Sequence, residues 1–431
     1  MARTAEGLRR GRRRQGKPAS ARGSLFALRD FRLFVASTFT ASMGAWLFRV
    51  VQDLVALELT HSITAVGLVT ACQFGPTCCS PISEERLRTA GLALGPCLLR
   101  HFLWGGGALG LLLPITSGTL TMPGLVVSAL CFGVATALDI PLRQATIADV
   151  VPLELLRPAL GVGSVSQQIG RLAGPSLGGL LILAGGYSLA LWFSVGFMAS
   201  AAVAASQVMR KLLASRRRAV PAKPTSGNTV RVRDFTSDQT IRFLLVLAAV
   251  CGVLAYNFSV LLIARAVDLS PNTNELYAFL NTIIAVGSII GATLAGRMQY
   301  GARGVLVFAV GLGTSIVLIG VLSGIILAGL ATLGLGICSM AYAVGSGVTI
   351  QSIAPREVRG RILSLQTLLL VGSTPFGSPL LGWFIDAVGT AAALAAVGCT
   401  TVVLALLALL VLPPARMGAP LNPARKCLRN P

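Results

Sequence analysis

Residues 161–179, GVGSVSQQIGRLAGPSLGG, restrict the fold of this chain more than any other stretch. Glycine recurs there, Arg171 is the one charge, and Pro175 lies near the middle of the membrane-length helix that contains the stretch. In a soluble helix each glycine costs about 1 kcal/mol relative to alanine. In a bilayer, small residues instead let helices pack closely, and neighbouring groups satisfy the backbone that a proline frees. The stretch therefore predicts a transmembrane helix that packs against a partner and bends around it.

The composition of the whole chain also indicates a membrane protein. Of its 431 residues, 54% are hydrophobic and only 12% are charged. Apolar runs of about 20 residues, long enough to cross a bilayer, recur from end to end. We therefore predict an all-α membrane protein with about twelve transmembrane helices in two pseudo-symmetric six-helix halves. The predicted spans are 33–59, 63–82, 92–117, 121–147, 157–185, 187–209, 240–264, 276–297, 303–324, 326–350, 359–387 and 390–412.

The net charge of +21 is concentrated outside these spans. Most of the 36 Lys and Arg lie in the two tails, in the central linker and in short loops that alternating spans place on one side. The positive-inside rule then puts both termini in the cytoplasm. We expect this charge to set topology and to contact anionic lipid rather than to bind nucleic acid. The basic N-terminal region leads into a full-length span, which is not the pattern of a cleavable signal.

The charge pattern divides the chain into five parts. They are a basic tail at 1–32, an N-terminal half at 33–210, a basic linker at 211–239, a C-terminal half at 240–412 and a tail at 413–431. The two halves have identical residues at several positions that are 203 residues apart. These are Ile147/Ile350, Pro152/Pro355, Glu154/Glu357, Gly174/Gly377, Gly179/Gly382 and Gly186/Gly389. Many transporters are built from two related halves, with the substrate site between them near the middle of the membrane.

Three segments carry a resemblance to a known family. They are WLFRVVQDLVALELTHSITAVGLVTACQF (46–74), ALDIPLRQATIADVVPLELLRPALG (137–161) and PREVRGRILSLQTLLLVGSTPFGSPLLGWFIDAVG (355–389). With them, nearly all of 29–412 resembles the major facilitator superfamily, and within it the enterobactin-exporter-like branch of bacterial efflux proteins. The resemblance implies alternating access driven by proton antiport.

The fifth predicted span matches the antiporter signature of that superfamily at every fixed position. The matching residues are Gly161, Gly170, Gly174, Pro175, Gly178 and Gly179. We expect these residues to pack helix five closely against the second half and so limit leak; generic helix packing is the alternative. The resemblance fails at 77–104, where the family's glycine-rich Asp-Arg loop is missing, through divergence or a reading-frame change. The equivalent second-half loop is better kept, with Gly291, Gly296, Arg297 and Arg303.

The first span contains ionisable groups that are costly in lipid and normally face the protein interior. Arg49 and Asp53 lie four residues apart on one helix face, with Gln52 beside them. A carboxylate that moves between two environments can gain and lose a proton, so Asp53 is our candidate proton carrier. The alternative is a static Arg49–Asp53 pair that tethers the helix.

Arg171 lies about 21 Å along the fifth span, near the middle of the membrane. Gln167 and Gln168 precede it by one turn and are positioned to share hydrogen bonds with it. Helices one and five are neighbours in the resembled fold, which makes Asp53 the best available partner for Arg171. Arg171 then pairs with Asp53 in one state and contacts an anionic substrate in another, or it belongs to a fixed structural pair.

Two loop regions hold the charges expected to gate the cytoplasmic side. Asp139 and Arg143 flank Pro141, with Glu154 and Arg157 in the following loop, and the second half has Arg356, Glu357, Arg359 and Arg361. We expect salt bridges there that form and break as the halves rock. The alternative is solvated charge that only sets topology.

The second half offers residues suited to an apolar cavity for amphipathic compounds: Tyr256, Asn257, Asn281, Gln351 and Gln366, with Phe243, Phe258, Phe279 and Tyr342. These aromatics fit lipid-facing positions equally well. We predict a proton-coupled secondary exporter in the bacterial inner membrane. Its partners are a small-molecule substrate, protons and membrane lipids, and we expect a monomer. Nothing in the sequence indicates an enzyme, a cofactor, a metal site or a nucleotide-binding loop. The alternatives are an importer or facilitator of the same fold, or a non-transporting or decayed membrane protein.

Overall fold

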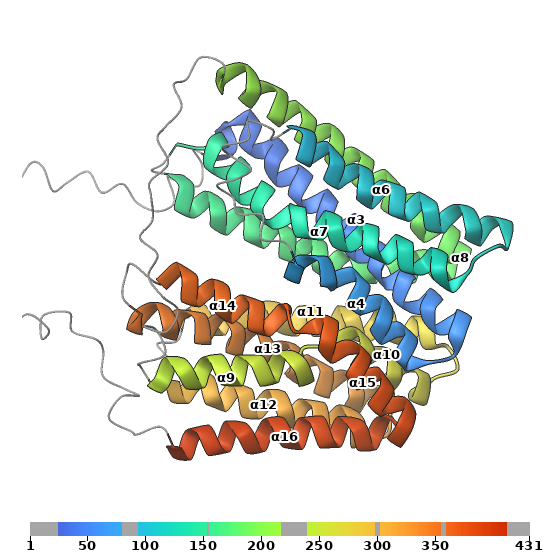
Figure 1. Cartoon of the computed structure of the whole chain (residues 1–431), viewed down its shortest axis with the longest axis vertical. Helices are drawn as coiled ribbons and strands as arrows, with labels where there is room; N and C mark the ends of the chain where they lie inside the picture. The colour runs from blue at the N-terminus through green and yellow to red at the C-terminus, as the bar shows by residue number, and fades with distance from the viewer. Residues whose placement is uncertain are drawn as a thin grey trace, which may run out of the picture.

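The computed structural model describes residues 25–79, 94–152, 155–216, 239–297, 302–354 and 359–411. Within these ranges the chain is helical and contains no strand. The helices are α3 Arg29–Thr60, α4 Ile63–Cys79, α6 Leu94–Ser117, α7 Met122–Val150, α8 Leu156–Arg216, α9 Gln239–Leu254, α10 Phe258–Leu269, α11 Thr273–Arg297, α12 Ala302–Val321, α13 Ile325–Ile353, α14 Arg359–Val371, α15 Thr374–Val388 and α16 Thr390–Val411. Figure 1 shows them in two bundles, with α3 to α8 in the upper one and α9 to α16 in the lower one.

The helices confirm the prediction of an all-α membrane protein with about twelve spans in two halves. Among the described residues, ten helices are long and apolar enough to cross a membrane, and Ile63–Cys78 is a shorter apolar helix. The longest, Pro158–Leu212, contains a break at Gly185 and Gly186. Gly186 has a φ of 70°, which glycine adopts without a Cβ clash. The break falls at the predicted boundary between the fifth and sixth spans.

The seventh and eleventh predicted spans are each divided into two helices. The first break lies at 255–257, between α9 and α10, and the second at 372–373, between α14 and α15. At the first break, Asn257 Oδ1 accepts a hydrogen bond of 2.8 Å from Ser378 Oγ, and Asn257 Nδ2 donates one of 2.6 Å to the Val253 carbonyl. Irregular backbone at membrane depth is tolerated where protein buries it or where it lines a cavity. The breaks therefore mark the interior face of the second half.

In the first half, α3 packs along α8, as the family resemblance implied for helices one and five. Glycine permits this approach: a Cβ at Gly174 would lie 2.8 Å from the Met43 carbonyl oxygen of α3. Ser42 Oγ of α3 also donates a hydrogen bond of 2.8 Å to the Gln167 carbonyl of α8. The pair forms a closely packed unit that carries Arg49, Asp53 and Arg171.

The glycine pattern of helix five thus has a different packing role from the one predicted. Gly170, Gly174 and Gly178 all face α3 of the same half, whereas Gly179 faces Ala278 of α11. Gly161 has open space around it. The pattern therefore fixes helix five mainly within the first half, and one of its glycines contacts the second half.

The two halves meet along α4 with α15 and along α8 with α11. We call the end of the bundle that holds Arg29 and Val411 the tail end, and the end that holds Ser62 and Gly389 the turn end. At the turn end, Asp386 of α15 accepts hydrogen bonds from Ser62 Oγ at 2.8 Å, from the Ile63 amide at 3.1 Å, and from the Thr64 amide and hydroxyl at 2.9 and 2.7 Å. This carboxylate caps α4 of the other half and closes the turn end.

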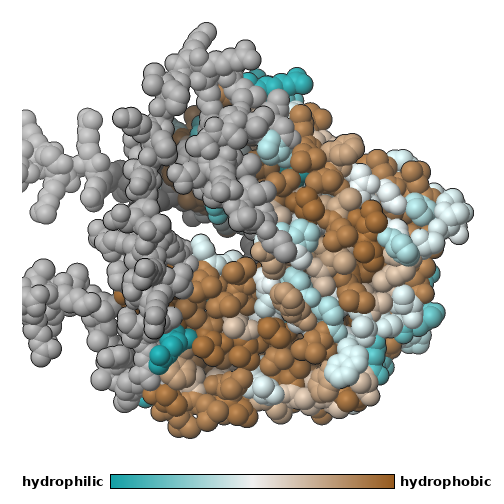
Figure 2. All heavy atoms as spheres, in the orientation of Figure 1, coloured by the Kyte–Doolittle hydropathy of each residue, from teal (hydrophilic) through white to brown (hydrophobic). Residues whose placement is uncertain are grey.

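The surface of both halves is suited to lipid. Figure 2 shows brown, hydrophobic residues over much of the visible face, with paler residues toward the turn end on the right. Large apolar side chains that are exposed include Phe102, Ile326, Trp383 and Leu410. A soluble monomer rarely exposes apolar surface on this scale, which supports the membrane assignment.

Candidate functional site

The predicted residues of α3 form the centre of a buried polar network. Gln52 and Asp53 are 0% exposed, and Arg49 is 8% exposed. Gln52 Nε2 donates a hydrogen bond of 3.0 Å to Ser128 Oγ of α7, and its Oε1 accepts one of 3.1 Å from Gln73 Nε2 of α4. Polar side chains at this depth are stable when each finds a partner.

Asp53 is held by groups from both halves of the molecule. Its Oδ2 accepts a hydrogen bond of 2.9 Å from the Tyr277 hydroxyl of α11, and its Oδ1 accepts one of 3.4 Å from Gln73 Nε2. Tyr277 belongs to the second half, so the network closes only while the halves are in contact here. The environment of the carboxylate is therefore tied to the arrangement of the halves.

Arg49 reaches across to the second half as well. Its Nε donates a hydrogen bond of 3.0 Å to Gln73 Oε1, and Nη2 donates one of 2.8 Å to Ser259 Oγ of α10. The guanidinium also lies over the rings of Trp46 and Phe74. The described residues include no direct ion pair between Arg49 and Asp53, and Gln73 hydrogen-bonds to both of them.

Arg171 is near this network but is not bonded to it. Its guanidinium carbon lies 4.4 Å from the centroid of the Trp46 ring, a cation–π contact. The described part of the chain shows no ion pair between Arg171 and Asp53, the partner expected from the sequence. Gln167 accepts the bond from Ser42 through its backbone, and the side chain of Gln168 lies outside the described residues.

A central cavity of about 570 Å³ lies between the two halves. Of the residues predicted to line a cavity, Tyr256, Asn257, Phe258, Asn281, Gln351 and Gln366 do line it, joined by Trp46, Arg49 and Arg171 of the first half. Phe279 is instead 47% exposed, and Tyr342 is fully buried. Phe243 packs against the core.

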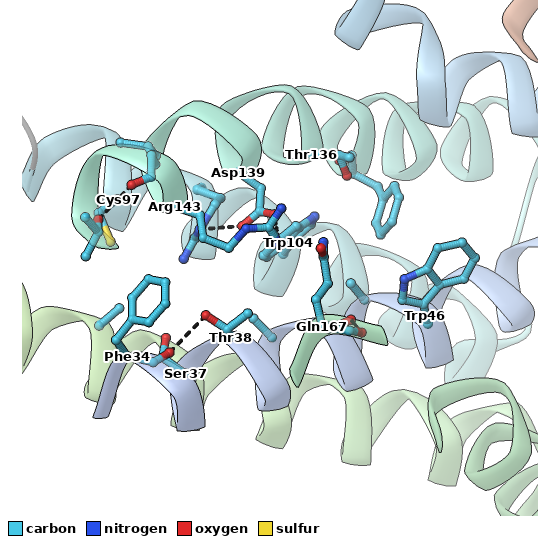
Figure 3. Close-up of a pocket in the computed structure, with 18 of the residues that line it drawn as sticks. Phe34, Ser37, Thr38, Trp46, Cys97, Trp104, Thr136, Asp139, Arg143 and Gln167 are labelled. Carbon is cyan, nitrogen blue, oxygen red and sulfur yellow. Dashed lines mark hydrogen bonds and ion pairs between the residues drawn. The ribbon is translucent and has the colours of Figure 1, made fainter. Parts of the chain in front are cut away.

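A smaller cavity of about 160 Å³ lies inside the first half and is drawn in Figure 3. Asp139, Arg143 and Gln167 point into it (Figure 3), and Asp139 pairs with Arg100 at 2.5 Å and with Arg143 at 3.3 Å. Trp46 lines both cavities, as do Arg49 and Phe74. These three side chains therefore form a partition between the two cavities.

The gating candidates are placed only in part. Asp139 and Arg143 pair within the first half rather than across the halves. Gly291 packs closely against Ile337 of α13, inside the second half, and Arg303 is exposed at the start of α12. The remaining candidates lie outside the described residues, either entirely or in their side chains: Gly296, Arg297, Arg356, Glu357, Arg359 and Arg361.

Four members of the network were not predicted from the sequence: Gln73, Ser128, Ser259 and Tyr277. Each is a neutral polar residue within an apolar segment, and each has a partner that is distant in sequence. Such residues are not found by looking for charged side chains within the spans. A search for every polar side chain on the helix faces opposite Asp53 finds them, but only once the helix pairing is known.

Comparison with known proteins identifies relatives of the whole chain. A family model described as transmembrane secretion effector matches residues 23–427. The chain is 25% identical over 393 residues to the enterobactin exporter EntS of Shigella flexneri, covering 89% of this chain and 91% of the relative. The same exporter of Salmonella typhi is 25% identical over 401 residues, with 89% and 92% covered.

Several solved transporters share the fold. A peptide transporter POT in complex with sulfate aligns with a TM-score of 0.69 at 13% identity, covering 89% of this chain and 94% of that one. The nucleoside transporter NupG aligns at 0.66 and 14%, with 89% and 99% covered. A bacterial homologue of the human lysosomal transporter Spinster, inward-facing and unoccupied, aligns at 0.62 and 14%, with 91% and 96% covered. At this level of identity, the similarity establishes the fold and no more.

Proposed function

We propose that this chain, which belongs to the transmembrane secretion effector family of the major facilitator superfamily, exports small amphipathic compounds in exchange for protons. The family membership makes it a multi-pass membrane transporter. Export as the direction is supported by the similarity to enterobactin exporters over most of the chain. The positive-inside rule supports a bacterial inner-membrane orientation with the tail end, both termini and the 211–239 linker in the cytoplasm.

One observation carries the proposal: two hydrogen bonds of the buried charged network cross between the halves. Tyr277 donates to Asp53, and Arg49 donates to Ser259. A rocking motion that separates the halves at this point breaks both bonds together. Asp53 then keeps its contact with Gln73, which belongs to its own half.

This change in partners links proton binding to conformation. Binding free energy couples to a conformational equilibrium when a ligand interacts differently with the two states, and a proton is such a ligand. Here the cross-half bonds and the Asp386 cap favour the arrangement in which the turn end is closed. Protonation of Asp53 changes what that carboxyl can accept or donate, and so changes the balance between the two arrangements.

The cavity fits an amphipathic cargo. Its volume of about 570 Å³ lies in the range of small-molecule sites, and its walls combine aromatic rings with amides such as Asn281 and Gln351. Contact between the halves at the turn end leaves the cavity to be reached from the tail end in this arrangement. A monomer is sufficient for this mechanism, because both halves belong to one chain.

Transport by inverted membrane vesicles tests the proposal. An acidic vesicle interior should drive uptake of an efflux dye, and a protonophore should abolish the uptake. Dye uptake that does not depend on the proton gradient would contradict the coupling of transport to protons. Accumulation of the dye by whole cells, without uptake by inverted vesicles, would reverse the direction and favour an importer of the same fold.

A further inference from the structure

The charged side chains that line the central cavity are all positive among the described residues. Among the described residues that line it, Arg49 and Arg171 are charged, and there is no Asp or Glu. Asp53 lines neither this cavity nor the smaller one. A cargo in the cavity therefore meets two guanidinium groups and no carboxylate from the described walls.

The two arginines differ in how their charge is compensated. Arg49 donates hydrogen bonds to Gln73 and Ser259, and through Gln73 it is linked to Asp53. Arg171 makes no hydrogen bond or ion pair with any residue that the structure describes, and its observed contact is the Trp46 ring. Arg171 is thus a cavity-lining charge whose hydrogen-bond donors are left for a ligand.

The position of Arg171 relative to Arg49 is a second reason to expect a ligand at Arg171. The two guanidinium carbons lie 4.9 and 4.4 Å from the same Trp46 centroid, so they are at most about 9 Å apart. Like charges at this separation repel each other, and the repulsion is weakly screened inside a membrane protein. An anion bound beside Arg171 would relieve the repulsion and supply the missing acceptors.

We propose that the transported compounds are organic anions, with an oxyanion group bound by Arg171 and a planar apolar body held among the cavity aromatics. This inference rests on the proposed function and narrows its substrate class. A guanidinium binds a planar carboxylate through two parallel hydrogen bonds, which suits Arg better than Lys. Trp46, Phe74, Tyr256 and Phe258 line the same cavity and provide stacking surface for the body of the cargo.

A cysteine probe measures the sign of the cavity potential without a known cargo. Asn281 lines the cavity, and its neighbour Thr282 is bonded to Ser176 of the helix that carries Arg171. We would place Asn281→Cys in a chain whose native cysteines are replaced. Its labelling rates with the anionic sulfonatoethyl and the cationic trimethylammonioethyl methanethiosulfonates are then compared, each normalised to a free thiol in solution.

We expect the anionic reagent to label the cysteine at position 281 at a higher normalised rate than the cationic reagent. We expect Arg171→Gln to lower that ratio of rates about tenfold. Arg171→Lys should retain it, which separates charge from a packing effect. Arg242→Gln is the matched control, because Arg242 is exposed at the start of α9. A preference for the cationic reagent, or one that Arg171→Gln leaves within twofold, overturns the proposal.

A binding assay in nanodiscs then tests the substrate class with three probes that share one ring system: 2-naphthalenesulfonate, 2-naphthalenemethanol and 2-naphthylmethylammonium. The sulfonate should bind at least about tenfold more tightly than the other two, and Arg171→Gln should remove the difference. Equal or reversed affinities overturn the anion proposal even if proton-driven transport is observed. Anion preference without proton-driven transport would instead remove the proposed function and leave this inference standing.

Discussion

Tyr277 and Asp53 belong to different halves of the molecule, and the Tyr277 hydroxyl donates a hydrogen bond of 2.9 Å to Asp53 Oδ2. Both side chains are almost completely buried, at 1% and 0% exposed. A buried carboxylate that depends on a donor from the opposing half must change its surroundings when the halves separate. In the proposed mechanism, this hydrogen bond connects the candidate proton site to the motion of the two halves.

Asp53→Asn should abolish proton-driven transport while leaving membrane insertion intact. The amide keeps the shape of the carboxyl group, and its single oxygen can accept at one of the two positions that face Tyr277 and Gln73, but it cannot take up a proton at physiological pH. The measurement is dye uptake by inverted vesicles at a fixed pH gradient. Asp30→Asn is the control, since Asp30 is an exposed carboxylate at the start of the same helix. Undiminished uptake by Asp53→Asn would remove Asp53 from the mechanism.

Tyr277→Phe should shift the conformational balance away from the arrangement seen here. A hydrogen bond to a charged group contributes about 1.5–3 kcal/mol, which corresponds to a shift of roughly 10- to 150-fold in the ratio of the two arrangements. Distances between spin labels on the two halves report the ratio. Thr401→Val also deletes a buried hydrogen bond, but one inside α16, and it should leave the ratio unchanged. Equal effects from both variants would mean that the cross-half bond has no special role.

Asp386→Ala should open the turn end more often. The carboxylate accepts four hydrogen bonds from Ser62, Ile63 and Thr64, and the loss of such a cap costs about 0.5–2 kcal/mol. A cysteine in the cavity at Asn281 should become more reactive toward an impermeant thiol reagent added at the turn end. Asp386→Asn keeps part of the hydrogen bonding and should have an intermediate effect. Unchanged reactivity in Asp386→Ala would show that other contacts alone hold this end closed.

Gly174→Ala should destabilise the folded protein, whereas Gly161→Ala should not. The added Cβ at 174 would lie 2.8 Å from the Met43 carbonyl, while the same atom at 161 meets no neighbour within 4 Å. Overpacking of this kind costs about 1–3 kcal/mol. Thermal unfolding of the detergent-solubilised variants measures the difference. If both variants unfold at the same temperature, the close packing of α3 on α8 does not require glycine at position 174.

Hydropathy alone was sufficient to predict most of the fold. Long apolar runs identify the spans, and Gly185–Gly186 separates the predicted fifth and sixth spans within α8. The breaks at 255–257 and 372–373 were not predicted, because apolar residues continue on both sides of each. What marks these breaks is a tertiary partner, such as the Ser378 hydroxyl for Asn257, and a local pattern does not contain it.

The candidate site could be predicted only in part from the sequence. Arg49 and Asp53 are visible as charges in a span, but their shared hydrogen-bond partner Gln73 depends on the rotation of α4 against α3. Arg171 faces Trp46 rather than Asp53, the partner expected from the sequence. Depth follows from counting residues along a helix, whereas the facing partner depends on how the helices pack.

A reversible cross-link between Ser176→Cys and Thr282→Cys tests the central claim most directly. The two hydroxyl oxygens lie 2.6 Å apart on α8 and α11, so the short side chains suit a disulfide between the halves. In a chain without its native cysteines, oxidation should stop proton-driven transport and a reductant should restore it, while Thr282→Cys alone should transport under both conditions. Transport at the normal rate with the cross-link complete would contradict a mechanism in which the halves must move apart.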